Sequence, residues 1–392
     1  MLEPLRDFLR HEAAAGRILM LAVVVALLAA NSPFHTQWVA LWEYVPFEST
    51  LLPNTLKAWV KDGLMAIFFF VVGLEMKREL ISGHLRDRQV AKLPLIAAVG
   101  GMVVPALVYL GITYRADHAV HMGWAIPCAT DIALALGVLA LLGNRVPVAL
   151  KVLLLALAIF DDLGAMVIIA FFYSGGMEPL ALLVAIGAWA TFAGVVHVRR
   201  FQKGWPTLLP LALALLMWLA LLPSGLHPSI GAVALAAVVP TKRMLPKLEH
   251  ALHPYVAFGI LPLFALSAAG VNIGSVVAML GGGAVLGPSP MLVFSGVGLG
   301  LLVGKPVGIA LSVWLAERSG IAKRPEGVSW KHIWGMGAIA GVGFTMSLFV
   351  GKLAFEGAHP ELLAAAKAGV MVGSLVAASL GVMLLARIGR VR

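Results

Sequence analysis

Two adjacent aspartates, Asp161 and Asp162, interrupt an apolar segment that runs from Leu150 to Tyr173. A helix of this length spans the hydrocarbon core of a bilayer, which places both carboxylates near the midplane, where charge is most costly. A third acid, Asp131, interrupts the apolar run 124–142, and Lys305 lies alone in another. Acids and a base within membrane spans are typical of a pathway for ions or protons.

The chemistry that suits these side chains is cation or proton binding. Sodium is a hard cation, so carboxylate, carbonyl and hydroxyl oxygens suit it better than nitrogen or sulfur. Neighbouring helical residues point about 100° apart, so Asp161 and Asp162 need not converge on one ion as a rigid pair. Two carboxylates about 6 Å apart repel by roughly 3 kcal/mol at an effective dielectric near 20. A proton or a cation relieves that repulsion, and we expect the two to compete for the same oxygens.

The composition places the chain in a membrane. Of its 392 residues, 60% are hydrophobic and 12% charged, and the mean hydropathy is +0.95. The net charge of +10 does not indicate a nucleic-acid partner, because the basic residues occupy short loops between apolar runs. Attraction to anionic lipid explains that charge better, so we expect the lipid bilayer as a partner. The single cysteine, Cys128, excludes an intramolecular disulfide and argues against a cysteine metal site, and no cofactor is expected.

Apolar runs of about 17–25 residues divide the chain into about twelve spans. No linker interrupts them, so residues 1–392 are expected to form a single membrane domain. The spans start near residues 13, 58, 93, 121, 148, 179, 205, 226, 251, 290, 330 and 361. Most of the 29 basic residues fall in one set of alternate loops, and the opposite set holds only Lys57, Lys61, Arg115 and Lys352. Basic loops stay in the cytoplasm, which places both termini there.

Two of these spans are predicted to be broken helices. Pro127 lies four residues before Asp131, and the span Ile333–Val350 carries glycines at positions 335, 337, 341 and 343. These spans hold corresponding positions in the groups 3–5 and 10–12, which predicts two inverted repeats with an ion site at the breaks. Facing half-helix ends carry partial charges. A carboxylate near the two positive ends and a lysine near the two negative ends would neutralise them.

Several of these motifs together closely resemble the bacterial NhaA family of sodium/proton antiporters. They are GLEMKREL, ATDIALALG, ALAIFDDLGA, LEHALHP and GFTMS, and the resemblance covers nearly the whole chain. It implies an all-α polytopic membrane protein with about 12 transmembrane helices, in which inverted repeats bring two broken helices to cross at the midplane. It also implies electrogenic export of Na⁺, and of Li⁺, in exchange for H⁺ across the bacterial inner membrane, by a protein that is not an enzyme.

The same resemblance assigns roles to individual residues. Asp161 and Asp162 would line the cation and proton site, with Asp162 as the main cation ligand and Lys305 as the partner of Asp161. Thr130 and Asp131 would lie at the helix crossing. A cytoplasmic cluster that sets the response to pH would comprise Glu75, Arg78, Glu79, Glu249, His250 and His253. A homodimer is implied as well, and Pro46–Asn54 is the candidate for an outer hairpin at its contact.

Other functions and plainer roles compete with this interpretation. A different Na⁺-coupled solute transporter would need a basic or polar substrate pocket, which Lys305 beside three acids does not suggest. An intramembrane aspartyl protease could use Asp131 with Asp161, but a GxGD-type motif surrounds neither residue. A passive channel is a further alternative, and the observation of electrogenic proton coupling would exclude it. Asp131 could simply cap a helix, Lys305 could extend toward the membrane surface, and the proposed pH-response cluster could be a solvated set of ion pairs.

Overall fold

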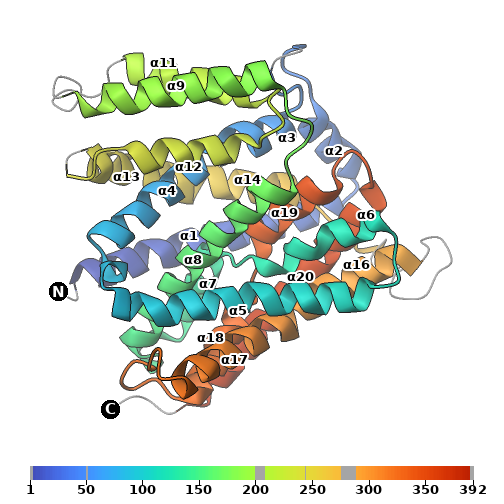
Figure 1. Cartoon of the computed structure of the whole chain (residues 1–392). Coiled ribbons are helices and arrows are strands. Elements are labelled where there is room, and N and C mark those ends of the chain that lie inside the picture. Colours follow the sequence, from blue (N-terminus) through green and yellow to red (C-terminus); the bar gives the residue numbers. More distant parts are fainter. Residues whose placement is uncertain (1–2, 50–51, 199–207, 243, 275–287, 389–392) are drawn as a thin grey trace. The chain divides into compact units, whose positions relative to one another are not determined.

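The computed structural model describes residues 3–49, 52–198, 208–242, 244–274 and 288–388, and within these ranges every regular element is a helix (Figure 1). The helices group into two compact units. Unit 1 comprises residues 1–34, 87–165 and 268–392, and unit 2 comprises residues 35–86 and 166–267. Unit 1 therefore contains the spans that we expect to form the two inverted repeats.

Unit 1 holds three groups of helices that are distant in the sequence. The first is α1 (Glu3–Ala30). The second comprises α5 (Arg88–Thr113), α6 (His118–His121), η3 (Met122–Cys128), α7 (Ile132–Leu141), η4 (Gly143–Arg145) and α8 (Val148–Phe172), whose last turns belong to unit 2. The third comprises α16 (Pro288–Leu299), η6 (Gly300–Gly304), α17 (Lys305–Arg318), α18 (Trp330–Ala340), α19 (Phe344–Phe355) and α20 (Pro360–Ala386).

Small residues let α5 and α17 pack closely, and the two helices lie side by side in Figure 1. A Cβ atom added to Gly308 would lie 2.1 Å from the carbonyl oxygen of Gly100, and one added to Gly304 would lie 2.7 Å from Pro105. Gly304 and Gly308 form a GxxxG pattern, which typically brings membrane helices into backbone contact. Lys305 lies between these glycines, so the close packing against α5 also fixes the position of the buried lysine.

Unit 2 has its own apolar core. Its elements are α2 (His35–Glu43), α3 (Leu56–Ala58), η1 (Trp59–Leu64), α4 (Met65–Ile81), η2 (His84–Arg86), α9 (Pro179–His197), α11 (Leu208–Leu221), α12 (Pro228–Val238), α13 (Met244–Tyr255), η5 (Val256–Ile260) and α14 (Leu261–Ala268). Leu74, Phe192, Leu221 and Leu235 are among the buried residues that pack together there. Each expected span start within the described residues falls in or just before a helix, and the start expected near residue 205 lies outside them.

Several helices of the described ranges have the length and composition of membrane spans. Six are long and apolar enough to cross a membrane, or up to nine if each bent pair of helices counts as one span. Large apolar side chains remain exposed, as at Phe171 of α8 (80% exposed) and at Leu208 of the shorter apolar helix α11 (83% exposed). Such surfaces are costly in water and are satisfied by lipid. The protein is therefore a multi-pass, all-helical membrane protein, while the total of twelve crossings stays a prediction.

Both predicted helix breaks are confirmed. The segment His118–Cys128 meets Ile132–Leu141 at a bend of 45°, and Trp330–Ala340 meets Phe344–Phe355 at a bend of 46°. The first break leaves residues 129–131 non-helical, just after Pro127, and the second leaves residues 341–343, which include two of the four glycines. Proline lacks an amide hydrogen and glycine weakens a helix, so both breaks follow from local sequence.

The segment between α1 and α3 contains a helix, α2, that the sequence pattern did not predict. The candidate hairpin Pro46–Asn54 is only partly covered, because residues 50 and 51 lie outside the described residues. In the described part, the side chain of Asn54 accepts a hydrogen bond from the amide of Ser49 (3.3 Å). The predicted hairpin therefore stays a prediction.

Candidate ion-binding site

The two adjacent aspartates lie in the middle of α8, and both are buried. Asp161 is 0% exposed and Asp162 is 2% exposed. Helix α8 keeps its α-helical form through both residues, so their side chains leave the helix in different directions. The Asp161 side chain reaches the lysine of α17 described next.

Lys305 and Asp161 form a fully buried ion pair in unit 1. The Nζ atom of Lys305 donates a hydrogen bond to Oδ2 of Asp161 over 2.5 Å, and both side chains are 0% exposed. Lys305 also donates to the carbonyl oxygen of Cys128, the last residue of η3. That carbonyl is at the negative end of the first half-helix. The expected placement of a lysine at the negative half-helix ends is thus confirmed at η3, while the other bond of Lys305 is made to Asp161.

The Asp131 carboxylate caps two helices at once. Its Oδ1 atom accepts a hydrogen bond from the Leu134 amide (3.0 Å) in the first turn of α7. Its Oδ2 atom accepts from both the amide (3.0 Å) and the hydroxyl (2.5 Å) of Thr345, in the first turn of α19. A helix N-terminus carries about half a positive charge, so one carboxylate balances two such ends. The predicted position of Asp131 at the positive ends of both broken helices is confirmed.

Direct hydrogen bonds join the two helix breaks. The Asp131 amide donates to the carbonyl oxygen of Val342 (2.7 Å), and the Thr130 hydroxyl donates to that of Ala340 (2.9 Å). Thr130 also lies beside the Asp161 carboxylate. Backbone groups freed at membrane depth must find partners within the protein, and each break supplies partners for the other. The structure therefore brings Asp131, Thr130, Lys305 and Asp161 into one connected network.

Sequence reasoning missed Thr345 as a member of this network. Its side chain is 2% exposed, and its hydroxyl group contacts a residue 214 positions away. A signal was present, because Thr345 follows the glycines of the second break and so falls in the first turn of the helix beyond it. Hydroxyl residues are favoured at such helix starts.

The predicted pH-response residues lie in unit 2 on two helices that are distant in the sequence. Arg78 of α4 bonds to Glu249 of α13 and to the neighbouring Glu79 (3.1 Å). Glu75 of α4 lies 3.6 Å from His253 of α13. Glu79 and Glu249 are both buried, so their ion pairs with Arg78 are not fully solvated contacts on the protein surface. His250, on the same helix as Glu249, is exposed and lies outside this pair of contacts.

Buried acids, a buried lysine and two helices broken at facing positions define an ion-coupled secondary transporter. The family model described as Na⁺/H⁺ antiporter 1 matches residues 6–385 of the chain. The Na⁺/H⁺ antiporter NhaA of Vibrio vulnificus is 44% identical over 98% of this chain and 96% of its own length. The antiporter of the same name from Rhodospirillum rubrum is 45% identical over 98% of this chain and 97% of its own length. The chain belongs to this family of Na⁺/H⁺ antiporters, and it is a transporter rather than an enzyme.

Proposed function

We propose that this chain exchanges Na⁺ for H⁺ at the α8 aspartates, with Asp162 as the main cation ligand. The observation that supports this most is the fully buried ion pair between Asp161 and Lys305. Lys305 pairs with Asp161, and the family resemblance assigns the main contact with the entering cation to the neighbouring carboxylate of Asp162. The family membership gives Na⁺ and H⁺ as the transported ions.

Exchange follows from competition between the cation and the proton for the same oxygens. Within the described residues, no group of three or more His, Cys, Asp and Glu side chains is placed to hold a metal ion. A cation at Asp162 would therefore complete its ligand shell with hydroxyl, carbonyl or water oxygens, which suit sodium. Separation of Lys305 from Asp161 would let Asp161 bind the cation or take a proton. Only the forms with a bound cation or bound protons would then switch the site from one side of the membrane to the other.

We further propose that the exchange is electrogenic and also accepts Li⁺. A second proton for each cation would move one extra charge inward, which yields about 2.3 kcal/mol per 100 mV of membrane potential. That energy can drive Na⁺ out of the cell. The buried side chains of Asp161 and Lys305, which contact each other, are our candidates for the site of this second proton.

The Arg78–Glu249 and Glu75–His253 contacts support a further proposal, that α4 and α13 set the response to pH. Protonation of Glu249 would remove the charge that it presents to Arg78 and would weaken the link between the two helices. Replacement of Arg78 by glutamine should shift the pH profile of transport while leaving the maximal rate largely intact. The same shift in Lys77→Gln, whose side chain bonds to the carbonyl oxygens of Ala237 and Val239 rather than to acids, would contradict this role.

The remaining proposals concern assembly and orientation. We place the chain in the bacterial inner membrane with both termini in the cytoplasm, because its basic residues concentrate in one set of loops. We propose one functional membrane domain over residues 1–392, with spans 3–5 and 10–12 as inverted repeats. A homodimer, with Pro46–Asn54 as the candidate contact, is proposed on the family resemblance.

The experiment that tests the function is dequenching of a pH-sensitive dye in inside-out vesicles from antiporter-deficient cells. We would add Na⁺, Li⁺ or K⁺ between about pH 6.5 and 8.5. Na⁺ and Li⁺, but not K⁺, should release protons from wild-type vesicles, and Asp162→Asn should abolish the signal. Asp117→Asn is the matched control, because Asp117 is exposed at the start of α6. A folded Asp162→Asn variant that keeps the Na⁺ response would overturn the assignment of Asp162.

A further inference from the structure

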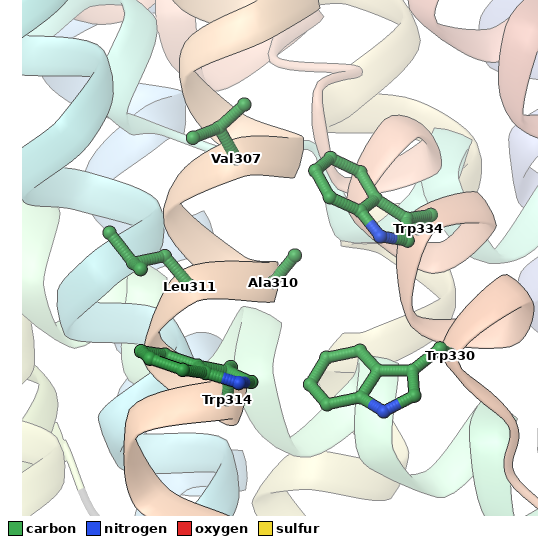
Figure 2. Close-up of a pocket in the computed structure, with 6 residues that line it drawn as sticks. All are labelled: Val307, Ala310, Leu311, Trp314, Trp330 and Trp334. Carbon is green, nitrogen blue, oxygen red and sulfur yellow. The ribbon is translucent and has the colours of Figure 1, made fainter.

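A groove between α17 and α18, in unit 1, has no part in the network around Asp161. Its volume is about 340 Å³. Figure 2 shows three indole rings and three aliphatic side chains along the groove, with Trp314 of α17 opposite Trp330 of α18 at one end. The lining residues are Val307, Ala310, Leu311, Trp314, Trp330 and Trp334.

The spacing of these residues gives each helix one apolar face toward the groove. On α17 they recur at intervals of three and four residues, and on α18 Trp330 and Trp334 are four residues apart. Leu311, Trp314 and Trp334 are 45%, 43% and 43% exposed. The groove is therefore open to the surroundings of the membrane protein, and its walls suit a hydrocarbon chain.

Positive charge lies at the end of the groove formed by Trp314 and Trp330. The guanidinium group of Arg318 lies over the Trp314 ring at 5.3 Å, and that of Arg324 lies over the Trp330 ring at 4.4 Å. Arg324 also pairs with Glu317 (2.7 Å), which offsets its charge. Arg318 and the nearby Lys323 and Lys331 are all exposed. This end therefore favours an anion, and because the indole faces already hold guanidinium groups, it disfavours a cationic ligand.

We propose that this groove binds an anionic phospholipid, with its phosphate at Arg318 and one acyl chain along α17. From Trp314 to Val307 the helix rises about 10 Å, which accommodates the upper part of an acyl chain. Tryptophan side chains are preferred at the level of lipid headgroups, and basic pockets between membrane helices suit anionic headgroups. The proposal is independent of the transport activity, because it concerns binding alone.

Native mass spectrometry of the full-length protein in detergent micelles tests this inference. We would titrate the delipidated protein with phosphatidylglycerol and, separately, with phosphatidylcholine of the same acyl chains. Wild type should bind at least one phosphatidylglycerol about fivefold or more tightly than phosphatidylcholine. Arg318→Gln should remove about fivefold of that affinity, since a basic residue near a lipid surface contributes about 1 kcal/mol. Arg115→Gln is the matched control, because Arg115 also stacks on an exposed aromatic ring, that of Tyr114 at 5.1 Å.

A second variant tests the groove itself. Leu311→Trp should fill part of the space and lower the affinity for both lipids, with an unchanged melting temperature because Leu311 is an exposed apolar residue. Should Leu311→Trp lower the melting temperature, Val307→Phe would take its place. Equal affinity of wild type for the two lipids would overturn the proposal. Unchanged phosphatidylglycerol binding by Arg318→Gln or by the groove-filling variant would overturn it as well.

Discussion

Lys305 and Asp161 are 144 residues apart in the sequence, yet their side chains meet over 2.5 Å with neither exposed to solvent. Burial of either charge costs desolvation free energy, and the attraction of the opposite charge offsets that cost. The pair also links α8, which carries the aspartates, to α17, whose position is fixed by its packing against α5. A change at either residue should therefore affect both stability and ion binding.

Lys305→Ala should destabilise the protein by about 3–5 kcal/mol, the cost typical of breaking a buried ion pair. The variant leaves the Asp161 carboxylate buried without its cation. Thermal unfolding in detergent, followed by intrinsic fluorescence, measures the loss. The double variant Asp161→Ala with Lys305→Ala should recover part of it, because no isolated charge remains.

An exposed pair of the same length provides the control for that prediction. Lys57 and Glu43 also lie 2.5 Å apart, but their side chains are 33% and 47% exposed. Exposed pairs contribute about 0–1 kcal/mol, so Lys57→Ala should change the unfolding temperature little. Similar losses for Lys57→Ala and Lys305→Ala would mean that burial is not the source of the stabilisation.

Asp131 variants should show that one carboxylate serves two helices. Asp131→Ala removes the acceptor for Leu134 and both acceptor contacts for Thr345, and loss of one helix cap costs about 0.5–2 kcal/mol. Asp131→Asn keeps one oxygen but no charge, so its stability should be intermediate. Thermal unfolding of both variants checks this order. Equal stability of Asp131→Asn and Asp131→Ala would argue that the Asp131 side chain does not cap both helices.

Gly343→Ala should disrupt the contact between the two helix breaks. A Cβ atom there would lie 2.1 Å from the Ser347 hydroxyl oxygen and 2.9 Å from the carbonyl oxygen of Ala129. We expect lower yield of folded protein and loss of transport in the vesicle assay. Gly111→Ala is the control, because nothing lies within 4 Å of a Cβ atom at that helical position. Equal tolerance of alanine at the two sites would contradict the observed packing of the breaks.

The Na⁺ concentration for half-maximal transport should fall as the pH rises. In the exchange that we propose, protons and Na⁺ compete for the same carboxylates, so a tenfold drop in proton concentration should raise the apparent Na⁺ affinity by up to tenfold per proton displaced. The measurement is the Na⁺ dependence of dequenching at several pH values. The logarithm of the half-maximal Na⁺ concentration is then plotted against pH. A fall of about one log unit per pH unit indicates one displaced proton for each Na⁺, and a fall of about two indicates two. A half-maximal concentration that stays constant with pH would rule out competition at these carboxylates.

Much of the site is local in origin and follows from the sequence. The apolar runs predict the helices, and the buried position of Asp161 and Asp162 follows from their place inside one such run. Proline at position 127 and glycines at positions 341 and 343 predict both breaks, because these residues weaken a helix whatever surrounds it. The composition likewise determines a multi-pass membrane protein.

The family resemblance named Lys305 as the partner of Asp161, but it is the tertiary structure that brings each charged residue to its partner. Lys305 could reach Asp161 only because glycines let α17 pack closely on α5, and Asp131 could cap α19 only because the two breaks meet. The residues of these two contacts are 144 and 214 positions apart in the sequence. Such contacts depend on how distant helices pack, which a local sequence pattern does not predict. Helix propensity and hydropathy act within a segment, so they determined where the charges are buried, while the packing of distant helices determined which group compensates each one.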